Sequence, residues 1–581
     1  MVVHAFCVNE FSVWRMLWYL LLGRRVRILA VFAIYTAFDR PLRWLVDRLT
    51  AKGRIARLGD DIEALAPLQD DPARALLSDY FNRIEPWLEN YFGFGDPDPG
   101  HSGYHRAFQH LTCNYIALQA VQIVAPSIAA ARSPETQVRF YGYPRDIAAA
   151  ACAFAGRDAL PQITTMRPPD RLLNLLFSLA LAAYSAAWLT VRVRASLAPP
   201  ARISMAYDYL DDPTQAALYR ELAGLGPFLL VPRNKPLAQE AEQLDLPPHN
   251  RRTITEGRFG FLDAIKCFGE AGRDWRQIRR RYGSCSARHF REVAGLVYRR
   301  LEYRGLFNLY EPRVYWGRDG YSAAHIIRRQ ELARFGGESW GVSHSYFALS
   351  DCYPEFRYLN FDRYYVMDRS TIERSYGEKW PDSMTVVGAQ PFRMSPALTR
   401  ESHCPKPPDI LILSSVSIWS PAFVRAAREI AEAFSDRTVR VQVKHNRQHL
   451  DACREFLDAV TKGLDHTEIV TERSPYALFP QSRYTVSDPS TAAVESIVSG
   501  CYGFVLNVEE AQLTNPLRHL DGVCVTSGPE AVSRIKAIEN GEWEYPSKAI
   551  AEHLDMSGTA FPDVIRRDFG LPPAGLEARR S

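Results

Sequence analysis

The chain has 581 residues, too many for a single hydrophobic core, and this length predicts two or three domains. Hydrophobic residues make up 47% and charged residues 23%, which excludes a disordered chain, and a net charge of +4 is too small at this size to indicate nucleic-acid binding. The ten cysteines are scattered without a Cys-x-x-Cys pair, which favours a reducing compartment and gives no zinc-site pattern.

The N-terminal region, residues 1–130, is predicted to be mostly helical. Its first 57 residues carry ten Arg or Lys and three acidic side chains. The basic residues flank apolar runs at 14–22 and 28–38, each of which is short for a membrane span. We expect this basic, amphipathic segment to lie on an anionic membrane surface, and a buried pair of helices is the alternative. No small-residue cleavage site follows, so a secretory signal is not expected.

A second apolar segment, residues 172–191, has twenty residues without a charge and is followed by Arg192 and Arg194. Its length matches a bilayer span, and the flanking arginines suit a cytoplasmic end. The stretch before it, 162–170, reads as a loop of a soluble domain. We therefore predict a buried or interfacial helix, inserted shallowly into the membrane, and keep a transmembrane span as the alternative.

Residues 137–392 are predicted to form a Rossmann-like domain that is interrupted by a polar stretch at 234–295. Its first strand is expected at 137–141. A helix is expected at 322–334, because Gly336-Gly337 provides a stop signal. Short apolar runs that end at turn residues predict the other strands, at 203–206, 313–316, 338–342, 362–367 and 384–387.

Polar residues follow three of these strands, and the carboxyl ends of parallel strands meet at one edge where ligands bind. His344 is the first candidate for a general base, because an imidazole titrates near neutral pH, and Asp319 is the second. A strand-end histidine that only bonds the backbone is the alternative for His344. Arg318 is a candidate for binding an anionic group, and Gln390 is a candidate cleft residue at the domain junction.

A proline-rich linker at 391–408 precedes the C-terminal domain, residues 409–540. Strand and helix patterns alternate there, which predicts a doubly wound parallel sheet. The tail, residues 541–581, carries a helix that we expect to cross back onto the first domain. The predicted strands are 409–415, 439–443, 467–471, 484–486 and 504–507, and the predicted helices are 421–434, 447–461, 474–480 and a helix that begins near 490.

Two strand ends of this domain predict an anion site. Asp488, Ser490 and Thr491 stand where a strand turns into a helix, and the first helical N–H groups have no partner inside the helix. Lys444 and His445 follow another strand, where they could meet a phosphate. Glu495 lies one helical turn after Thr491 and could hold a sugar hydroxyl. An ordinary N-cap is the alternative for the whole motif.

The order of these elements resembles the donor-binding half of GT-B glycosyltransferases of bacterial surface and capsular polysaccharide synthesis, including polysialyltransferase and CDP-glycerol glycerophosphotransferase families. The likeness covers roughly residues 310–540. It implies an α/β fold of two Rossmann-like domains, here with an added helical, membrane-associating N-terminal region. It also implies that Lys444, His445, Ser490 and Thr491 contact the donor phosphates. Asn446 stands where the family has Pro, and Ser345 stands where it has Gly.

The resemblance implies a metal-independent glycosyltransferase at the cytoplasmic face of the inner membrane. The expected partners are a nucleotide-sugar donor, a lipid-linked or polysaccharide acceptor and an anionic membrane surface, without nucleic acid and without a cofactor. Transfer of glycerol phosphate from a CDP-linked donor and a catalytically silent GT-B scaffold are the alternatives. Asp96-Pro97-Asp98 matches the Asp-x-Asp metal motif, but it falls in a Pro/Gly-rich turn and is not expected to bind metal.

Overall fold

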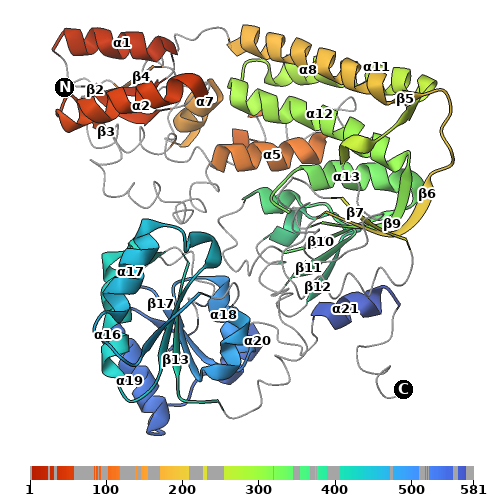
Figure 1. The fold of residues 1–581 in the computed structure, drawn as a ribbon. Coiled ribbons are helices and arrows are strands. Elements are labelled where there is room, and N and C mark those ends of the chain that lie inside the picture. Colours follow the sequence, from red (N-terminus) through yellow and green to blue (C-terminus); the bar gives the residue numbers. More distant parts are fainter. Residues whose placement is uncertain are drawn as a thin grey trace.

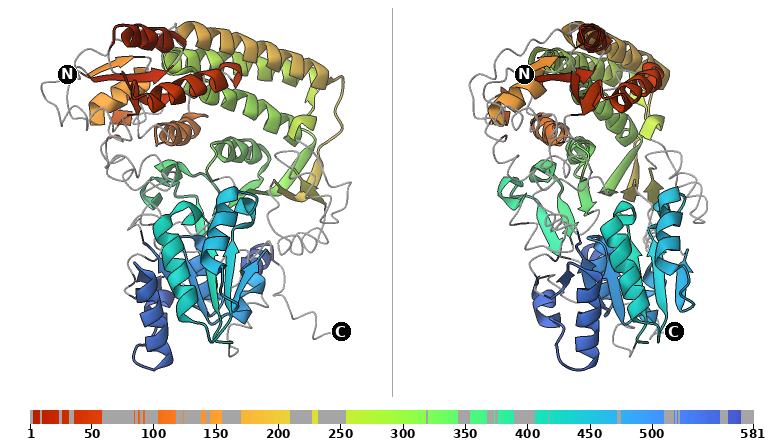
Figure 2. Two further views of the ribbon diagram at one scale, coloured as in Figure 1. Left: turned by 60° about the vertical axis from the view of Figure 1, so that its left-hand side comes forward. Right: turned by 90° about the vertical axis from the view of Figure 1, so that its left-hand side faces the viewer.

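The computed structural model combines parallel β-sheets with a layer of long helices (Figure 1). The structure describes residues 3–8, 10–23, 26–31, 36–57, 84, 87–88, 91–92, 103–117, 123, 138–141, 145–154, 170–208, 227–231, 254–317, 320–343, 354–366, 373, 376–388, 406–415, 417–471, 475–508, 517, 520, 522–553 and 561–570. The C-terminal sheet lies at one end of the molecule and the long helices lie at the other (Figures 1 and 2).

The C-terminal sheet has six parallel strands in the order β15-β14-β13-β16-β17-β18, which confirms the predicted doubly wound arrangement. The order reverses between β13 and β16, where the chain returns from the edge to the centre of the sheet. The strands are β13 (Ile410–Ser414), β14 (Val439–Val443), β15 (Thr467–Val470), β16 (Tyr484–Ser487), β17 (Tyr502–Leu506) and β18 (Cys524–Val525). The helices are α16 (Pro421–Ala433), α17 (Asp451–Thr461), α18 (Thr491–Val498), α19 (Gly528–Glu539) and α20 (Ser547–His553).

One predicted helix of this domain is wrong. Residues 474–480 contain two short 3₁₀ turns, Pro475–Ala477 and Phe479–Gln481, instead of one α-helix. Pro480 explains the difference, because a proline inside a helix removes a hydrogen bond and clashes with the preceding turn.

The central sheet also has six parallel strands, in the order β12-β11-β10-β9-β6-β7, and α13 (Ala324–Leu332) packs against β9 and β10. On the other face, α21 (Phe561–Asp568) contributes Val564 and Ile565 to a cluster with Trp316 and Trp340, so the tail helix crosses back as predicted. The strands are β6 (Ala201–Tyr207), β7 (Phe228–Leu230), β9 (Tyr310–Gly317), β10 (Glu338–Val342), β11 (Arg363–Val366) and β12 (Thr385–Gly388).

The N-terminal region differs from its prediction, because it contains a four-stranded parallel sheet in the order β3-β2-β1-β4. The strand predicted to open the central domain is β4, and it pairs with β1 instead, with Val138 opposite Val3. The periodicity of a short apolar run such as 26–31 is the same for a buried strand and a buried helix, so the sequence pattern does not distinguish these strands from helices. The elements are β1 (Val3–Val8), α1 (Glu10–Leu21), β2 (Val26–Val31), α2 (Thr36–Ala51), β3 (Ile55–Arg57), α5 (His105–Ala117), β4 (Val138–Tyr141) and α7 (Arg145–Phe154).

Three long helices, α8 (Asp170–Arg192), α11 (Phe261–Tyr282) and α12 (Ala287–Phe307), pack side by side above the central sheet. Helix α11 and the start of α12 lie in the polar stretch 234–295 that interrupts the predicted domain. A pairing of β5 (Val193–Arg194) with β8 (Phe259–Gly260) joins the end of α8 to the start of α11.

Arg304 ties this helical layer to the central domain. Its guanidinium donates to both carboxylate oxygens of Glu331 on α13, at 3.0 and 3.1 Å, and to Glu270 on α11 at 2.7 Å. Paired donation to a carboxylate fixes orientation as well as distance. Arg304 thus fixes the position of α12 relative to α11 in the helical layer and to α13 in the central domain.

A buried ion pair provides a test of the central domain. Arg328 and Asp208 lie 3.2 Å apart with side chains that are 0% and 3% exposed. Arg328→Ala leaves the Asp208 carboxylate without this partner, so we expect the free energy of unfolding to fall by about 3–5 kcal/mol. Arg334→Ala removes a 43% exposed partner of Glu331 and should cost at most about 1 kcal/mol. Equal losses for the two variants in chemical denaturation would contradict this assignment.

Candidate functional site

The strands at the centre of the C-terminal sheet end level with one another. Ser414 of β13 lies opposite Val443 of β14, and Leu413 lies opposite Ser487 of β16. The next residues are held to β13 as well, because Lys444 N donates to Ser414 O at 2.9 Å and Asp488 N donates to Leu413 O at 3.2 Å. Neighbouring strands are about 4.8 Å apart, so Lys444 and Asp488 flank the end of β13 at the point where the strand order reverses.

Asp488 is fully buried, and its carboxylate points toward the loop that follows β13. Its Oδ2 atom accepts hydrogen bonds from Ser415 N at 2.6 Å, from Ser417 N at 3.1 Å and from Ser414 Oγ at 3.3 Å. Contact of Asp488 with a donor molecule stays a prediction. Asp488 is a positioning residue that fixes the loop after β13 beside the turn after β16.

Helix α18 begins without a capping side chain. Ser490 has the extended backbone of an N-cap residue, but its hydroxyl makes no capping hydrogen bond to the helix. Two other helices of this domain also begin after serine, and there the hydroxyl accepts from the helix: Ser420 from Phe423 N at 3.2 Å and Ser527 from Glu530 N at 3.3 Å. The contrast separates α18 from the ordinary N-cap that was its alternative. Its first-turn N–H groups and the positive end of its dipole are suited to an anion.

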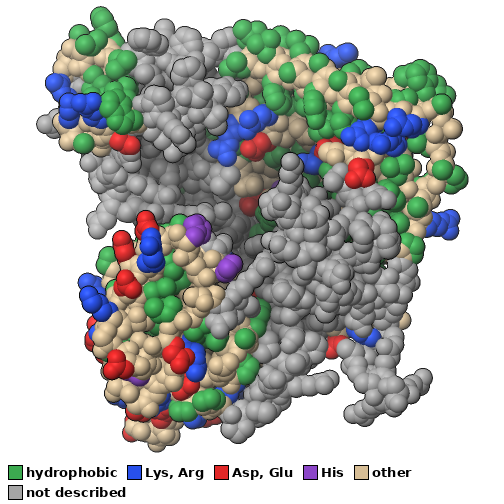
Figure 3. Space-filling view, in the orientation of Figure 1, with side chains coloured by type: hydrophobic (Ala, Val, Ile, Leu, Met, Phe, Trp, Pro, Cys, Tyr) green, Lys and Arg blue, Asp and Glu red, His purple; other side chains and the backbone are tan. Residues whose placement is uncertain are grey.

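Basic and aromatic side chains line the same edge. Lys444 and His445 are both exposed where β14 ends, as the sequence predicted, and histidine side chains are visible on the rim of this domain (Figure 3). The guanidinium of Arg447 lies 5.0 Å from the ring centroid of Trp419, a side chain that is 51% exposed after β13. Trp419 and Arg447 were missed in the sequence, where the only signal was a tryptophan close behind a strand end.

Thr491 and Glu495 occupy successive turns of α18. Thr491 is half-buried at the start of the helix, and Glu495 is 6% exposed. The next residues of α18 pack closely against the sheet: Thr485 Oγ1 and Ser496 Oγ are 2.6 Å apart, and a Cβ on Gly503 would lie 2.6 Å from Ile497. Contact between Glu495 and a sugar hydroxyl stays a prediction.

The candidate residues of the central domain lie outside the described residues. These are Asp319, His344, Arg318 and Gln390, and their roles stay predictions. The described strands before them end level, since Gly317 of β9 lies opposite Gly341 of β10 and Val366 of β11 lies opposite Gly388 of β12.

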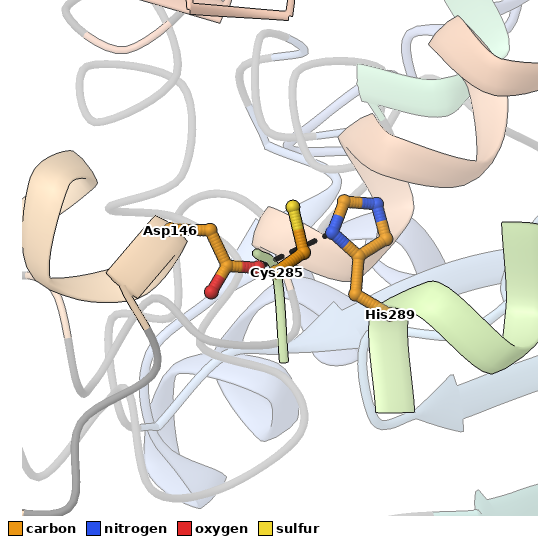
Figure 4. A group of neighbouring side chains, drawn as sticks. All are labelled: Asp146, Cys285 and His289. Atoms are coloured by element: carbon orange, nitrogen blue, oxygen red, sulfur yellow. Dashed lines mark hydrogen bonds and ion pairs between the residues drawn. The ribbon is translucent and has the colours of Figure 1, made fainter. Parts of the chain in front are cut away.

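A buried group of side chains in the helical layer has donor atoms of the kinds that bind metals. Asp146, Cys285 and His289 place one such atom each within 4.8 Å of the others (Figure 4). However, both ring nitrogens of His289 are already within hydrogen-bonding distance of a partner, Nδ1 at 3.2 Å from Asp146 and Nε2 at 3.1 Å from Thr112 Oγ1. This arrangement fits a buried hydrogen-bond network that joins α7, α5 and α12 better than a metal centre.

A groove of about 520 Å³ on the C-terminal domain lies away from the strand ends. It runs between α16 and α19, and its α16 residues belong to the last turns of that helix, toward the opposite edge of the sheet. It is lined by Glu429, Ala433, Pro529, Val532, Ser533, Lys536, Ala537 and Glu542. The candidate site is therefore an open edge and not this groove.

No family model matches the chain, and no curated protein matches it. Solved structures that resemble it include a variant of the wall teichoic acid polymerase TagF, with a TM-score of 0.39, 10% identity and coverage of 70% of this chain and 98% of that one. UGT89C1 of Arabidopsis thaliana has a TM-score of 0.39 and 12% identity, and it covers 64% of this chain and 100% of that one. UDP-N-acetylglucosamine 2-epimerase of Rickettsia bellii has a TM-score of 0.35 and 12% identity, with coverage of 63% and 98%. Similarity this distant does not support a functional assignment.

Substitutions can distinguish the positioning role of Asp488 from the role of Ser490 at the uncapped start of α18. Asp488→Ala removes the acceptor of three hydrogen bonds, so the free energy of unfolding should fall by about 2–4 kcal/mol. Ser490→Ala should change it by less than about 0.5 kcal/mol, because this hydroxyl caps nothing. Ser527→Ala is the matched control and should cost about 1 kcal/mol through the lost cap. A Ser490→Ala loss as large as the Ser527→Ala loss would show that Ser490 is an ordinary cap.

Proposed function

We propose that this chain is a GT-B-type transferase whose C-terminal domain binds the phosphates of a nucleotide-linked donor. The observation that carries the proposal is the uncapped start of α18 after β16, with Lys444 at the end of β14 on the other side of β13, where the strand order reverses. In open α/β sheets, ligands bind at such a point. The order of motifs described from the sequence adds the expectation of glycosyl transfer.

The chemistry follows from where negative charge develops. A sugar that leaves a nucleotide transfers charge to the departing phosphate in the transition state, and fixed positive dipoles there lower the barrier. The Lys444 ammonium, the His445 imidazole and the N–H groups of α18 supply such charge from the protein itself. Trp419 offers an exposed ring at the same rim on which a nucleobase could stack.

The acceptor half of the reaction is proposed for the central domain. His344 would take the proton of the acceptor hydroxyl, with Asp319 as the second candidate. Arg318 and Gln390 would hold the acceptor or the donor from the central domain. The acceptor proposed is lipid-linked or a polysaccharide, and the reaction would need no metal because the cradle supplies positive charge.

Two alternatives are kept because specific residues favour them. A phosphate cradle serves a CDP-glycerol-type donor as well as a nucleotide sugar. A catalytically silent GT-B scaffold is favoured by Asn446 and Ser345, which replace the residues that the resemblance leads us to expect. Nucleotide binding separates the three.

Calorimetry with the full-length chain tests the proposal with CMP, CDP, UDP, GDP and TDP. We expect one nucleotide to bind selectively, and Lys444→Ala and the double variant Ser490→Ala/Thr491→Ala each to weaken that binding at least tenfold, because each removes phosphate contacts. A uridine, guanosine or thymidine nucleotide would favour a nucleotide sugar, whereas a cytidine nucleotide is common to a CDP-linked donor and a CMP-linked sugar, which binding of CDP-glycerol itself would then separate.

Ser527→Ala is the matched control for this experiment, since it alters the start of α19 and should bind nucleotide like the unmodified chain. Folded protein that binds none of the five nucleotides would overturn the transferase and leave the silent scaffold. Unchanged affinity in the α18 and Lys444 variants would move the binding site elsewhere.

A further inference from the structure

Helix α8 turns its leucines outward. Leu172, Leu176 and Leu179 are 49%, 53% and 58% exposed, and their spacing of four and three residues places them on one face. Tyr184 and Val191, at 56% and 69%, extend the apolar surface toward the end of the helix. Among the described residues, this is the one helix long and apolar enough to cross a bilayer by length and composition, but only 28% of its apolar window is buried.

The buried face of α8 carries polar residues beside apolar ones, since Trp188 and Leu189 are 9% and 4% exposed. Asn174, Ser178 and Ser185 are 0%, 9% and 0% exposed. The Asn174 amide donates to Gly283 O at 3.1 Å and to Cys285 O at 3.0 Å, in the connection between α11 and α12. These bonds hold α8 against the connection between α11 and α12, so one face of the helix is covered by protein while the leucine face is not.

Helix α11 extends the apolar surface. Phe261, Leu262 and Ile265 are 61%, 78% and 57% exposed. The pairing of Val193 with Phe259 brings the start of α11 to the end of α8, close to Val191. Exposed leucines, isoleucine and phenylalanine thus continue from one helix to the next, whereas single exposed apolar residues would need no explanation.

The acidic and basic side chains of α11 lie on different faces of the helix. Its acidic residues point inward: Asp263 accepts from Asn308 at 2.9 Å, Glu270 accepts from Arg304 at 2.7 Å, and burial raises the pKa of the Asp274 carboxyl. The charged side chains that the helix exposes are all basic, namely Lys266, Arg273, Arg276, Arg279 and Arg280. An apolar face bordered by cations complements a surface with an apolar interior and anionic headgroups.

The apolar surface lies at one end of the molecule. Helices α8 and α1 run along the end remote from the C-terminal sheet in all views, and hydrophobic side chains gather there with Lys and Arg beside them (Figures 1, 2 and 3). On α1 and just after it, Trp18, Leu21 and Leu22 are 61%, 81% and 54% exposed. We propose that α8 and α11 dock this chain on the surface of an anionic lipid bilayer without crossing it.

Docking of this kind lays α8, roughly 35 Å long at 1.5 Å per residue, parallel to the membrane plane. The leucines enter the boundary between headgroups and acyl chains, and the α11 cations reach the lipid phosphates. The bilayer contact does not depend on the proposed transfer reaction.

Co-sedimentation of the full-length chain with preformed vesicles tests this proposal. Vesicles of phosphatidylcholine alone are compared with vesicles that contain phosphatidylglycerol. We expect binding to the anionic vesicles that falls at least tenfold in Leu176→Gln/Leu179→Gln/Leu262→Gln and in Arg273→Gln/Arg276→Gln/Arg280→Gln. Raised salt should weaken the binding of the unmodified chain.

Matched controls carry the same changes elsewhere on the surface. Ile469→Gln on β15 and Arg454→Gln on α17, at positions that are also exposed, should bind vesicles like the unmodified chain. Retained nucleotide binding or an unchanged melting temperature shows that the helix variants are folded. Vesicle binding that survives both sets of helix substitutions would overturn the proposal. A second result would also overturn it: the unmodified chain does not bind vesicles but forms a dimer, and the leucine substitutions abolish that dimer. A second copy of the chain would then cover the apolar surface of α8 and α11.

Discussion

The candidate site depends on one buried carboxylate. Asp488 follows β16, yet two backbone N–H groups of the loop after β13 donate to it, and a serine hydroxyl adds a third bond. Strands β13 and β16 are neighbours where the strand order reverses. The Asp488 contact therefore fixes the loop after β13 and the turn after β16 relative to each other. The N–H of Ala493 donates to Ser490 O at 3.2 Å, so Thr491 and Ala492 are the residues whose first-turn N–H groups we propose for a substrate phosphate.

The fold of the C-terminal domain could be predicted from the sequence because its signals are local. Strand β13 is an uninterrupted apolar run, β14 alternates apolar and polar residues, and α16, α18 and α19 each have a serine just before their start. The location of Ser490 and Lys444 at strand ends followed from the same patterns. The role of Asp488 could not be predicted, because it depends on contacts with residues more than seventy positions earlier in the chain.

The N-terminal sheet could not be predicted for a different physical reason. Strand β4 pairs with β1 across more than one hundred residues, and no local pattern records which sheet a strand joins. Helix α11 carries six basic residues in its 22 positions, so it reads as a polar stretch until the structure shows which face is covered. The long apolar segment of α8 is evident in the sequence, but the contacts of Asn174 are not, because they reach Gly283 and Cys285 more than one hundred residues later.

The two functions that we propose, donor binding and docking on a bilayer, therefore lie at opposite ends of the molecule. Polar N–H groups and a lysine gather at an open sheet edge of the C-terminal domain, where charge can be stabilised. Exposed apolar side chains bordered by basic ones lie on α8 and α11, where we propose that the chain contacts a bilayer. Arg304 connects the helical layer to α13 of the central domain, so the helical layer and the central domain form one packed unit.

Hydrogen exchange of the full-length chain, with and without a mixture of the nucleoside diphosphates, tests the central claim most directly. We predict slower exchange of backbone amides at three places when nucleotide is present: the start of α18 from Thr491, the loop 415–420 and the turn after Lys444. Protection confined to another part of the chain, or exchange unchanged by saturating nucleotide, would contradict the assignment of this sheet edge as the donor site.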